Sequence, residues 1–189
     1  FDKSTNILIN DDNSSSLLEI SKKIIADDNK ESLKYLKKSI KLGNPEAMNI
    51  YGFMLKNGEN IPVDYEKAVE LFQNAINQGN SDAMNNYGLM LFNGEGVPTD
   101  KEEANKYFLM AIGCENSDAM FNYANSLEHG EGVLTDIEKA INFYKMAADY
   151  GNKNAQKKLN EMPDFLHVWK ISYINKYIYI LLYFFFFFF

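Results

Sequence analysis

Acidic side chains recur at fixed intervals in this 189-residue sequence. Two carboxylates held in different environments can act as general acid and general base, so such a pattern raises the question of catalysis. Each aspartate, however, directly precedes a segment of helical periodicity, where aspartate is favoured as the N-cap. The glutamates fall in polar loops. We therefore interpret both sets as structural. The recurring residues are Glu59, Glu95 and Glu131, and Asp64, Asp100 and Asp136.

Other residues that could carry chemistry are scarce. The sequence has two histidines, His129 and His167, and one cysteine, Cys114. A metal site would need further ligands at helical spacing from these residues, and neither a second cysteine nor a suitably spaced histidine supplies one. Gly94-x-Gly96 follows a helical segment rather than a strand, and it lacks the later Gly and Lys of a phosphate-binding loop. We expect a protein that is not an enzyme and has no cofactor and no metal.

The acidic residues belong to a repeat of the whole sequence. The motif Ala-Met-x-x-Tyr-Gly begins at Ala47 and at Ala83, and Ala-Met-x-x-Tyr-Ala begins at Ala119. The two intervals, 83 − 47 and 119 − 83, are both 36 residues. A fixed period of this size indicates an array in which each unit packs against its neighbours.

Each unit predicts two helices joined by a glycine loop. Recurring apolar residues of the first helix cover one arc of about 140° at helical periodicity. Gly52 and Gly88 lie inside this arc, which predicts a close approach of the second helix. Asn44 followed by proline predicts a helix start, and Gly94 suits a left-handed helix end. Asp100 is the expected N-cap of the next helix, with a capping box to the glutamate three residues later.

The pattern predicts nine helices and no strand pairing between residues 44 and 151. The expected ranges are 16–26, 29–42, 45–57, 65–78, 81–93, 101–113, 117–129, 137–150 and 153–162. Polar residues 1–15 are expected to be disordered. Residues 16–162 form the expected repeat domain, with a partial unit at 16–43, full units at 44–79, 80–115 and 116–151, and a partial capping helix at 152–162.

These residues resemble the Sel-one-like repeat, a relative of the tetratricopeptide repeat. The best match runs from Gly130 to Ala155 as Gly-x-Gly-Val-x-x-Asp-x-x-Lys-Ala-x-x-Phe-Tyr-x-x-Ala-Ala-x-x-Gly-x-x-x-Ala. The resemblance implies an all-α fold, an α/α solenoid of antiparallel helix pairs wound into a right-handed superhelix. It also implies a protein-interaction scaffold whose first helices line a concave groove.

The apolar tail, residues 163–189, has two interpretations. A membrane span needs about 20 apolar residues, and a segment of that length here would include Asn175 and Lys176. The alternative is translated non-coding sequence, because the tail is rich in residues that AT-rich codons encode and ends in six phenylalanines. Both interpretations stay open, so membrane association is undecided.

Composition restricts the partners. The net charge is −7, and all 19 basic residues are lysines. Nucleic-acid binding is not expected, because there is neither a basic stripe nor an arginine fork for phosphate or guanine.

The single cysteine rules out an intrachain disulfide and favours a reducing compartment. We expect a cytoplasmic protein, with the endoplasmic reticulum membrane as the alternative. The sequence begins with Phe1 rather than Met, so the lack of a signal peptide proves nothing.

The candidate binding surface lies on the first helices, opposite the apolar arc. Asparagine can both donate and accept and so can hold an extended peptide backbone, and apolar residues on this face can anchor partner side chains. Alternatively, Phe53 and Phe121 pack against adjacent units. The predicted protein-binding residues are Asn49, Phe53, Asn85, Asn86, Leu89, Phe92, Phe121, Asn122 and Asn125.

The favoured function is a non-enzymatic scaffold or adaptor that binds a protein or peptide in the concave groove. Two alternatives remain at this point. One is the repeat region of a larger membrane-tethered protein of endoplasmic-reticulum quality control, acting as a ubiquitin-ligase adaptor. The other is a non-catalytic fragment of a multidomain signalling enzyme.

Overall fold

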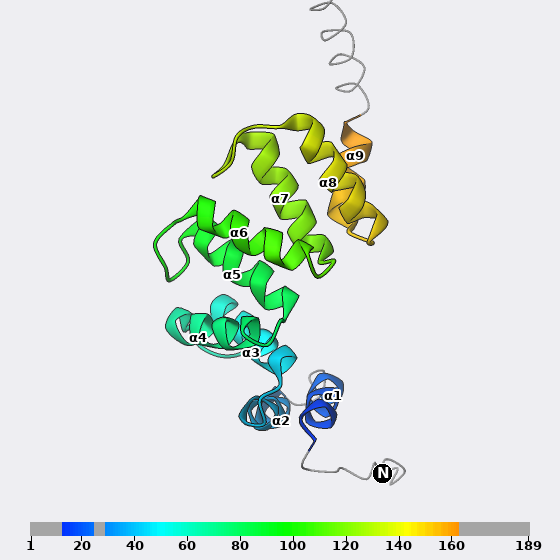
Figure 1. The fold of residues 1–189 in the computed structure, drawn as a ribbon. Coiled ribbons are helices and arrows are strands. Elements are labelled where there is room, and N and C mark those ends of the chain that lie inside the picture. Colours follow the sequence, from blue (N-terminus) through cyan, green and yellow to red (C-terminus); the bar gives the residue numbers. More distant parts are fainter. Residues whose placement is uncertain (1–12, 25–28, 163–189) are drawn as a thin grey trace, which may run out of the picture.

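Helix pairs stack in chain order in the computed structural model, which describes residues 13–24 and 29–162 (Figure 1). The helices are α1 (Ser14–Ile24), α2 (Asn29–Lys41), α3 (Pro45–Asn57), α4 (Tyr65–Ile76), α5 (Ser81–Asn93), α6 (Lys101–Ile112), α7 (Ser117–His129), α8 (Ile137–Asp149) and α9 (Lys153–Glu161). No strand occurs in the described ranges. The predicted helices are all present, and the prediction of an all-α repeat solenoid is confirmed.

The start of α1 differs from the prediction. Ser14 and Ser15, which the sequence placed in a disordered segment, belong to the helix. The Oδ1 atom of Asn13 accepts a hydrogen bond from the backbone N–H of Ser15 at 3.0 Å, and this contact supports an earlier start. The rest of the predicted disordered segment, residues 1–12, and the apolar tail, residues 163–189, lie outside the described residues.

Local capping sets the helix ends. Asn80 is the N-cap of α5 and accepts from Ala83 N–H, and Asp100 is the N-cap of α6 and accepts from Glu103 N–H. Gly94 ends α5 in the left-handed conformation, with φ 74°, as predicted. The second hydrogen bond of a capping box would run to the Glu103 carboxylate. This carboxylate accepts from Lys106 Nζ at 2.7 Å instead. The aspartates at 64, 100 and 136 are thus helix caps.

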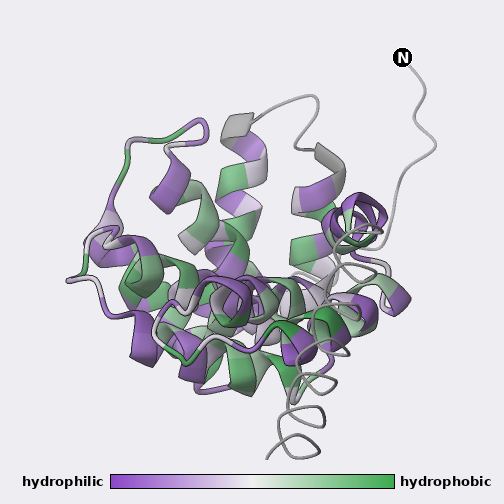
Figure 2. Cartoon of the chain, turned by 90° about the horizontal axis from the view of Figure 1, so that it is seen from above, coloured by the Kyte–Doolittle hydropathy of each residue, from purple (hydrophilic) through white to green (hydrophobic). Residues whose placement is uncertain are grey.

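Close packing within each pair depends on the glycines of the first helices. A Cβ atom added to Gly88 would lie 2.7 Å from Cε1 of Phe108, and one added to Gly52 would lie 2.9 Å from Cε1 of Phe72. Both phenylalanines are almost completely buried. The helices carry both hydrophobic and hydrophilic residues (Figure 2), as amphipathic helices do. The predicted close approach is confirmed.

The loops connect successive units. Lys56 of α3 forms an ion pair at 3.2 Å with Glu95, which lies on the loop after α5 in the next unit. Lys101 of α6 forms an ion pair at 2.8 Å with Glu131, which lies on the loop after α7 in the unit after that. The loop also packs closely: a Cβ atom on Gly132 would lie 2.4 Å from the backbone carbon of Lys101. Two of the three recurring glutamates therefore join neighbouring units.

Candidate peptide-binding groove

An open hollow with a volume of about 670 Å³ lies along the first helices. It is named here the first-helix hollow. Helices α3, α5 and α7 and the loop after α3 supply its lining, and α4, α6 and α8 supply none of it. These are the helices on which the sequence predicts a groove. The lining residues are Asn49, Ile50, Phe53, Met54, Glu59, Asn60, Asp82, Asn85, Asn86 and Asp118.

The floor of the hollow is a ladder of amide side chains. Asn86 Nδ2 donates to Asn49 Oδ1 at 2.9 Å, and Asn122 Nδ2 donates to Asn85 Oδ1 at 2.8 Å. Each bond joins a first helix to the first helix of the next unit. Asn49 and Asn85 occupy equivalent positions 36 residues apart, so the ladder repeats with the array. All four asparagines stabilise the stack, and Asn49, Asn85 and Asn86 also line the hollow.

Two amide Nδ2 groups in this ladder do not donate to the ladder itself. Asn49 and Asn85 are 8% and 6% exposed as whole residues, and both line the hollow. Their Oδ1 atoms accept from the next unit, whereas within the described part of the chain their Nδ2 groups donate to no acceptor. Neither Nδ2 is a fully buried, unsatisfied atom, so each remains accessible. The arrangement can offer hydrogen bonds to an incoming carbonyl.

An apolar area adjoins the amide floor. Phe53 is 39% exposed although it is a large hydrophobic residue, and Ile50 and Met54 lie in the same lining. Lys56 Nζ lies 5.7 Å from the centre of the Phe53 ring, but its charge is paired with Glu95. An exposed aromatic ring beside buried amides is suited to anchoring an apolar side chain of a partner.

The rim of the hollow is acidic. Glu59, Asp82 and Asp118 line it, and no lysine does. Within the described residues, Asp82 accepts from Asn116 Nδ2 at 2.7 Å and Asp118 accepts from Asn152 Nδ2 at 2.6 Å. Amide donors are neutral, so they orient the two carboxylates without cancelling their charge.

The other predicted binding residues lie outside this lining. Leu89, Phe92 and Phe121 are partly buried and pack against the hydrophobic cluster of the later units. The Phe121 ring lies 5.6 Å from the ring of Tyr144, centre to centre. Asn125 Oδ1 lies 2.7 Å from the Tyr144 hydroxyl oxygen, and Asn122 is the donor of the ladder bond already described. The predicted residues that the hollow does bring together are Asn49, Phe53, Asn85 and Asn86.

Sequence reasoning missed the acidic rim. Asp82 and Asp118 occupy the second position of their helices, where an acidic residue is expected merely to favour the helix N-terminus. A signal was nevertheless present, because the two residues are 36 apart and Glu46 holds the same position one unit earlier. Their common direction becomes visible only when the units are stacked.

A second hollow, of about 510 Å³, lies at the C-terminal end of the described array beside α7, α8 and α9. Glu128 lines it and joins a polar network there: it accepts from the Tyr144 hydroxyl at 2.6 Å and pairs with Lys158 at 3.0 Å. Burial by itself would raise the pKa of Glu128, but the hydrogen bonds from Tyr144 and Lys158 outweigh burial and leave the pKa below its ordinary value. Burial and this carboxylate raise the pKa of Tyr144. The network holds α9 against α7.

Two features are absent from the described ranges. No group of three or more histidine, cysteine, aspartate or glutamate side chains is placed to hold a metal ion there. Among the helices of residues 13–24 and 29–162, none combines the length and the apolar character needed to cross a membrane.

Solved structures with the same architecture come from several bacteria. A Sel1 repeat protein from Oxalobacter formigenes superimposes with a TM-score of 0.75 at 27% identity, over 80% of this chain and 64% of that one. A protective antigen of uropathogenic Escherichia coli, described as displaying an SLR fold, gives a TM-score of 0.72 at 26% identity, over 80% of this chain and 34% of that one. The chain thus covers less than two thirds of either relative's length.

A third structure, Helicobacter pylori cysteine rich protein B, shares the fold with a TM-score of 0.54 at 21% identity, over 65% of this chain and 92% of that one. No curated protein matches the sequence. The family model described as the Sel1 repeat matches four consecutive segments, residues 21–44, 45–80, 81–113 and 117–152. These segments include most of the sequence and follow the stacked helix pairs, and the chain belongs to the Sel1 repeat family.

Proposed function

We propose that this chain is a non-enzymatic scaffold or adaptor that holds a protein or peptide in the first-helix hollow. Sel1 repeat proteins are generally protein-interaction scaffolds, and the fold is typically non-catalytic. The observation that supports a binding role for this hollow is its composition: buried amide groups with accessible donors lie beside the exposed ring of Phe53. This combination suits an extended segment with one apolar anchor.

The nine predicted residues divide into two roles in this proposal. Asn49, Phe53, Asn85 and Asn86 form the contact surface. The remaining five support its shape by packing or hydrogen bonding behind it, and they are Leu89, Phe92, Phe121, Asn122 and Asn125. We further propose the cytoplasm as the compartment, because the single cysteine, Cys114, is free and a reducing environment keeps it so.

Selection of peptides on the full chain tests the proposal. A random peptide library is bound to the intact protein, and the dissociation constants of the selected peptides are measured for the wild type and for Phe53→Ala. Loss of an anchoring ring is expected to weaken binding about tenfold or more. Leu134→Ala is the matched control, because Leu134 is 91% exposed on a loop and does not line the hollow. Peptides that bind both variants as tightly as the wild type would contradict the proposal.

A further inference from the structure

The acidic rim of the first-helix hollow belongs to a longer row of carboxylates. Glu46, Asp82 and Asp118 each occupy the second position of a first helix, in α3, α5 and α7. The intervals between them, 82 − 46 and 118 − 82, are both 36 residues, so the stacking places one carboxylate in each unit. Asp82 and Asp118 line the hollow.

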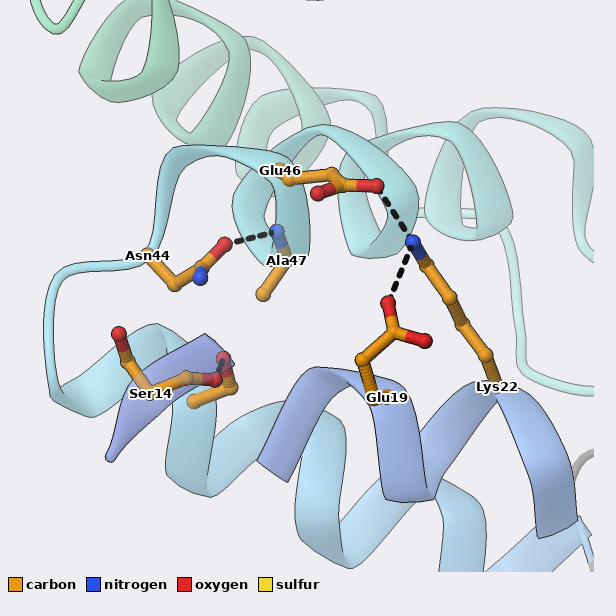
Figure 3. A network of polar contacts seen from close by, with 7 residues as sticks. Ser14, Glu19, Lys22, Asn44, Glu46 and Ala47 are labelled. Carbon is orange, nitrogen blue, oxygen red and sulfur yellow. Dashed lines mark hydrogen bonds and ion pairs between the residues drawn. The ribbon is translucent and has the colours of Figure 1, made fainter. Parts of the chain in front are cut away.

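The first carboxylate of the row already holds an ammonium group. Lys22 of α1 reaches α3, where its Nζ lies 2.5 Å from Glu46 Oε1 and 3.3 Å from Glu19 Oε1 (Figure 3). These contacts raise the pKa of Lys22, with the hydrogen bond to Glu46 as the largest cause. The chain itself therefore shows which group a carboxylate at this register binds.

The next two carboxylates have no such partner within the described residues. Asp82 and Asp118 accept only from Asn116 and Asn152, the N-caps of α7 and α9, and no lysine of the described residues is within ion-pair distance. Glu59, on the loop beside them, is contacted by Asn57 Nδ2 at 3.2 Å. Three negative charges thus face one hollow in a chain of net charge −7, and such a field attracts cations.

A second observation points to a peptide rather than to a simple cation. The buried side chains of Asn49 and Asn85 line the same hollow one unit apart, and their Nδ2 groups have no acceptor in the described part of the chain. An accessible amide donor in a hollow can bond to an occupant, and the carbonyl groups of an extended backbone supply acceptors at regular intervals. A metal ion offers none.

From these contacts we infer that the occupant of the first-helix hollow is an extended peptide segment that carries lysine or arginine. Its backbone carbonyls accept from Asn49 and Asn85. Its ammonium or guanidinium groups bind Asp82 and Asp118 as Lys22 binds Glu46, and an apolar side chain contacts Phe53. This inference rests on the proposed function and adds the charge of the partner to it.

The test compares two charge variants in the same peptide selection. Asp82→Asn/Asp118→Asn removes the rim charges and keeps an oxygen that can accept from the asparagine caps, so the fold is retained. Glu102→Gln/Glu138→Gln is the matched control, because it removes the same charge from exposed carboxylates in the first turns of α6 and α8. Circular dichroism melts of both double variants check that the solenoid stays folded.

Peptides selected on the wild-type chain are expected to be enriched in lysine and arginine. Their dissociation constants should rise about tenfold in the rim variant and change little in the control, because ion pairs with the rim carboxylates depend on the position of the charges and not only on net charge. Equal weakening in both double variants would overturn the inference, since general attraction to an acidic protein would then explain the binding.

The two proposals fail in different ways. If the selected peptides depend on Phe53 but show no basic enrichment and ignore the rim variant, the scaffold proposal stands and the basic occupant is wrong. If no selected peptide depends on Phe53, both proposals are wrong. Glutamine in place of each lysine of a selected peptide gives an independent check, because it should reduce affinity for the wild type but not for Asp82→Asn/Asp118→Asn.

Discussion

At the scale of single residues, close contacts across the array decide which side chains are tolerated. Gly88 is the clearest case, since a Cβ atom there would lie 2.7 Å from the Phe108 ring and 3.3 Å from the backbone oxygen of Ala104. The third unit has Ala124 at this position and Tyr144 in the opposing helix. The position therefore accepts one methyl group when the opposing ring is placed differently.

Substitutions at Gly88 should be graded by size. Gly88→Leu is expected to destabilise the chain by about 1–3 kcal/mol through overpacking against Phe108. Gly88→Ala should cost less, because the ring can shift and alanine favours the helix by about 1 kcal/mol. Urea unfolding measures both free energies. If the leucine variant unfolds at the wild-type urea concentration, the close approach does not limit this position.

The Glu128 network makes stability depend on pH. The pKa of Glu128 is lower in the folded chain than its ordinary value, so its stabilising contribution is present above the ordinary pKa of about 4.3 and is lost as pH falls through the lower folded value. Glu128→Gln keeps an acceptor for Tyr144 but loses the charge beside Lys158. The wild type should therefore be more stable than the variant near neutral pH, and the difference should disappear in acid. A difference that persists unchanged at low pH would show that the charge is not its source.

At the scale of helices and loops, the loop of one unit packs on the helix start of the unit before it. Gly132 and Gly79 both have positive φ, 68° and 80°, so alanine is strained at either position. Only Gly132 faces a neighbour, the backbone of Lys101, whereas nothing lies within 4 Å of a Cβ atom on Gly79. Comparing substitutions at Gly79 and Gly132 therefore separates the cost of backbone strain from the cost of lost packing between units.

Gly79→Ala should cost about 1–2 kcal/mol, the usual penalty for a left-handed residue with a side chain. Gly132→Ala should cost more, because the loop must also move away from Lys101 and weaken its ion pair with Glu131. Chemical unfolding of the two variants gives the comparison. Equal costs would mean that the loop adapts freely and contributes little to the contact between units.

The packing of Phe92 and Phe121 determines how much stability the chain should lose when either side chain is truncated. Because both rings pack against the hydrophobic cluster, their alanine variants are expected to lose about 2–4 kcal/mol of stability, below the cost for fully buried phenylalanine. Phe53→Ala should change stability by less than about 1 kcal/mol, since this ring is 39% exposed. Thermal melts of the three variants decide the order. Unchanged melting of the Phe92 and Phe121 variants would place both rings at the surface.

The helices and their caps could be predicted because their signals are local. Asn80, Asp100 and Gly94 act on backbone groups within a few residues, so the sequence around each one specifies its role. The direction of Phe92 could not be predicted, because it depends on how far the next pair is rotated. The Asn49–Asn86 bond joins residues 37 apart and likewise requires the stacked units. The part of the site that lies between units could therefore not be predicted from the sequence of one unit.

At the scale of the whole molecule, stability is distributed along a line of units that contact only their neighbours. Among the described residues of α1 and α2, the buried side chains are leucines and serines. Ser32 Oγ donates to the backbone oxygen of Ser21 at 2.9 Å, and Ser39 Oγ donates to that of Ser14 at 2.6 Å. The later pairs bury large aromatic side chains such as Phe72 and Phe108. Hydrogen-bonded serines contribute less net burial energy than aromatic rings.

The N-terminal pair should consequently open before the middle of the array. In native-state hydrogen exchange followed by mass spectrometry, amides of α1 and α2 are expected to exchange at lower denaturant concentration than those of α5 and α6, because local unfolding follows the weakest interface. The ion pair of Lys22 with Glu46 ties α1 to α3, so Lys22→Gln should widen the difference without changing exchange in α6. Simultaneous exchange of all the described helices, in the wild type and in the variant, would instead mean that the solenoid unfolds as a single cooperative unit.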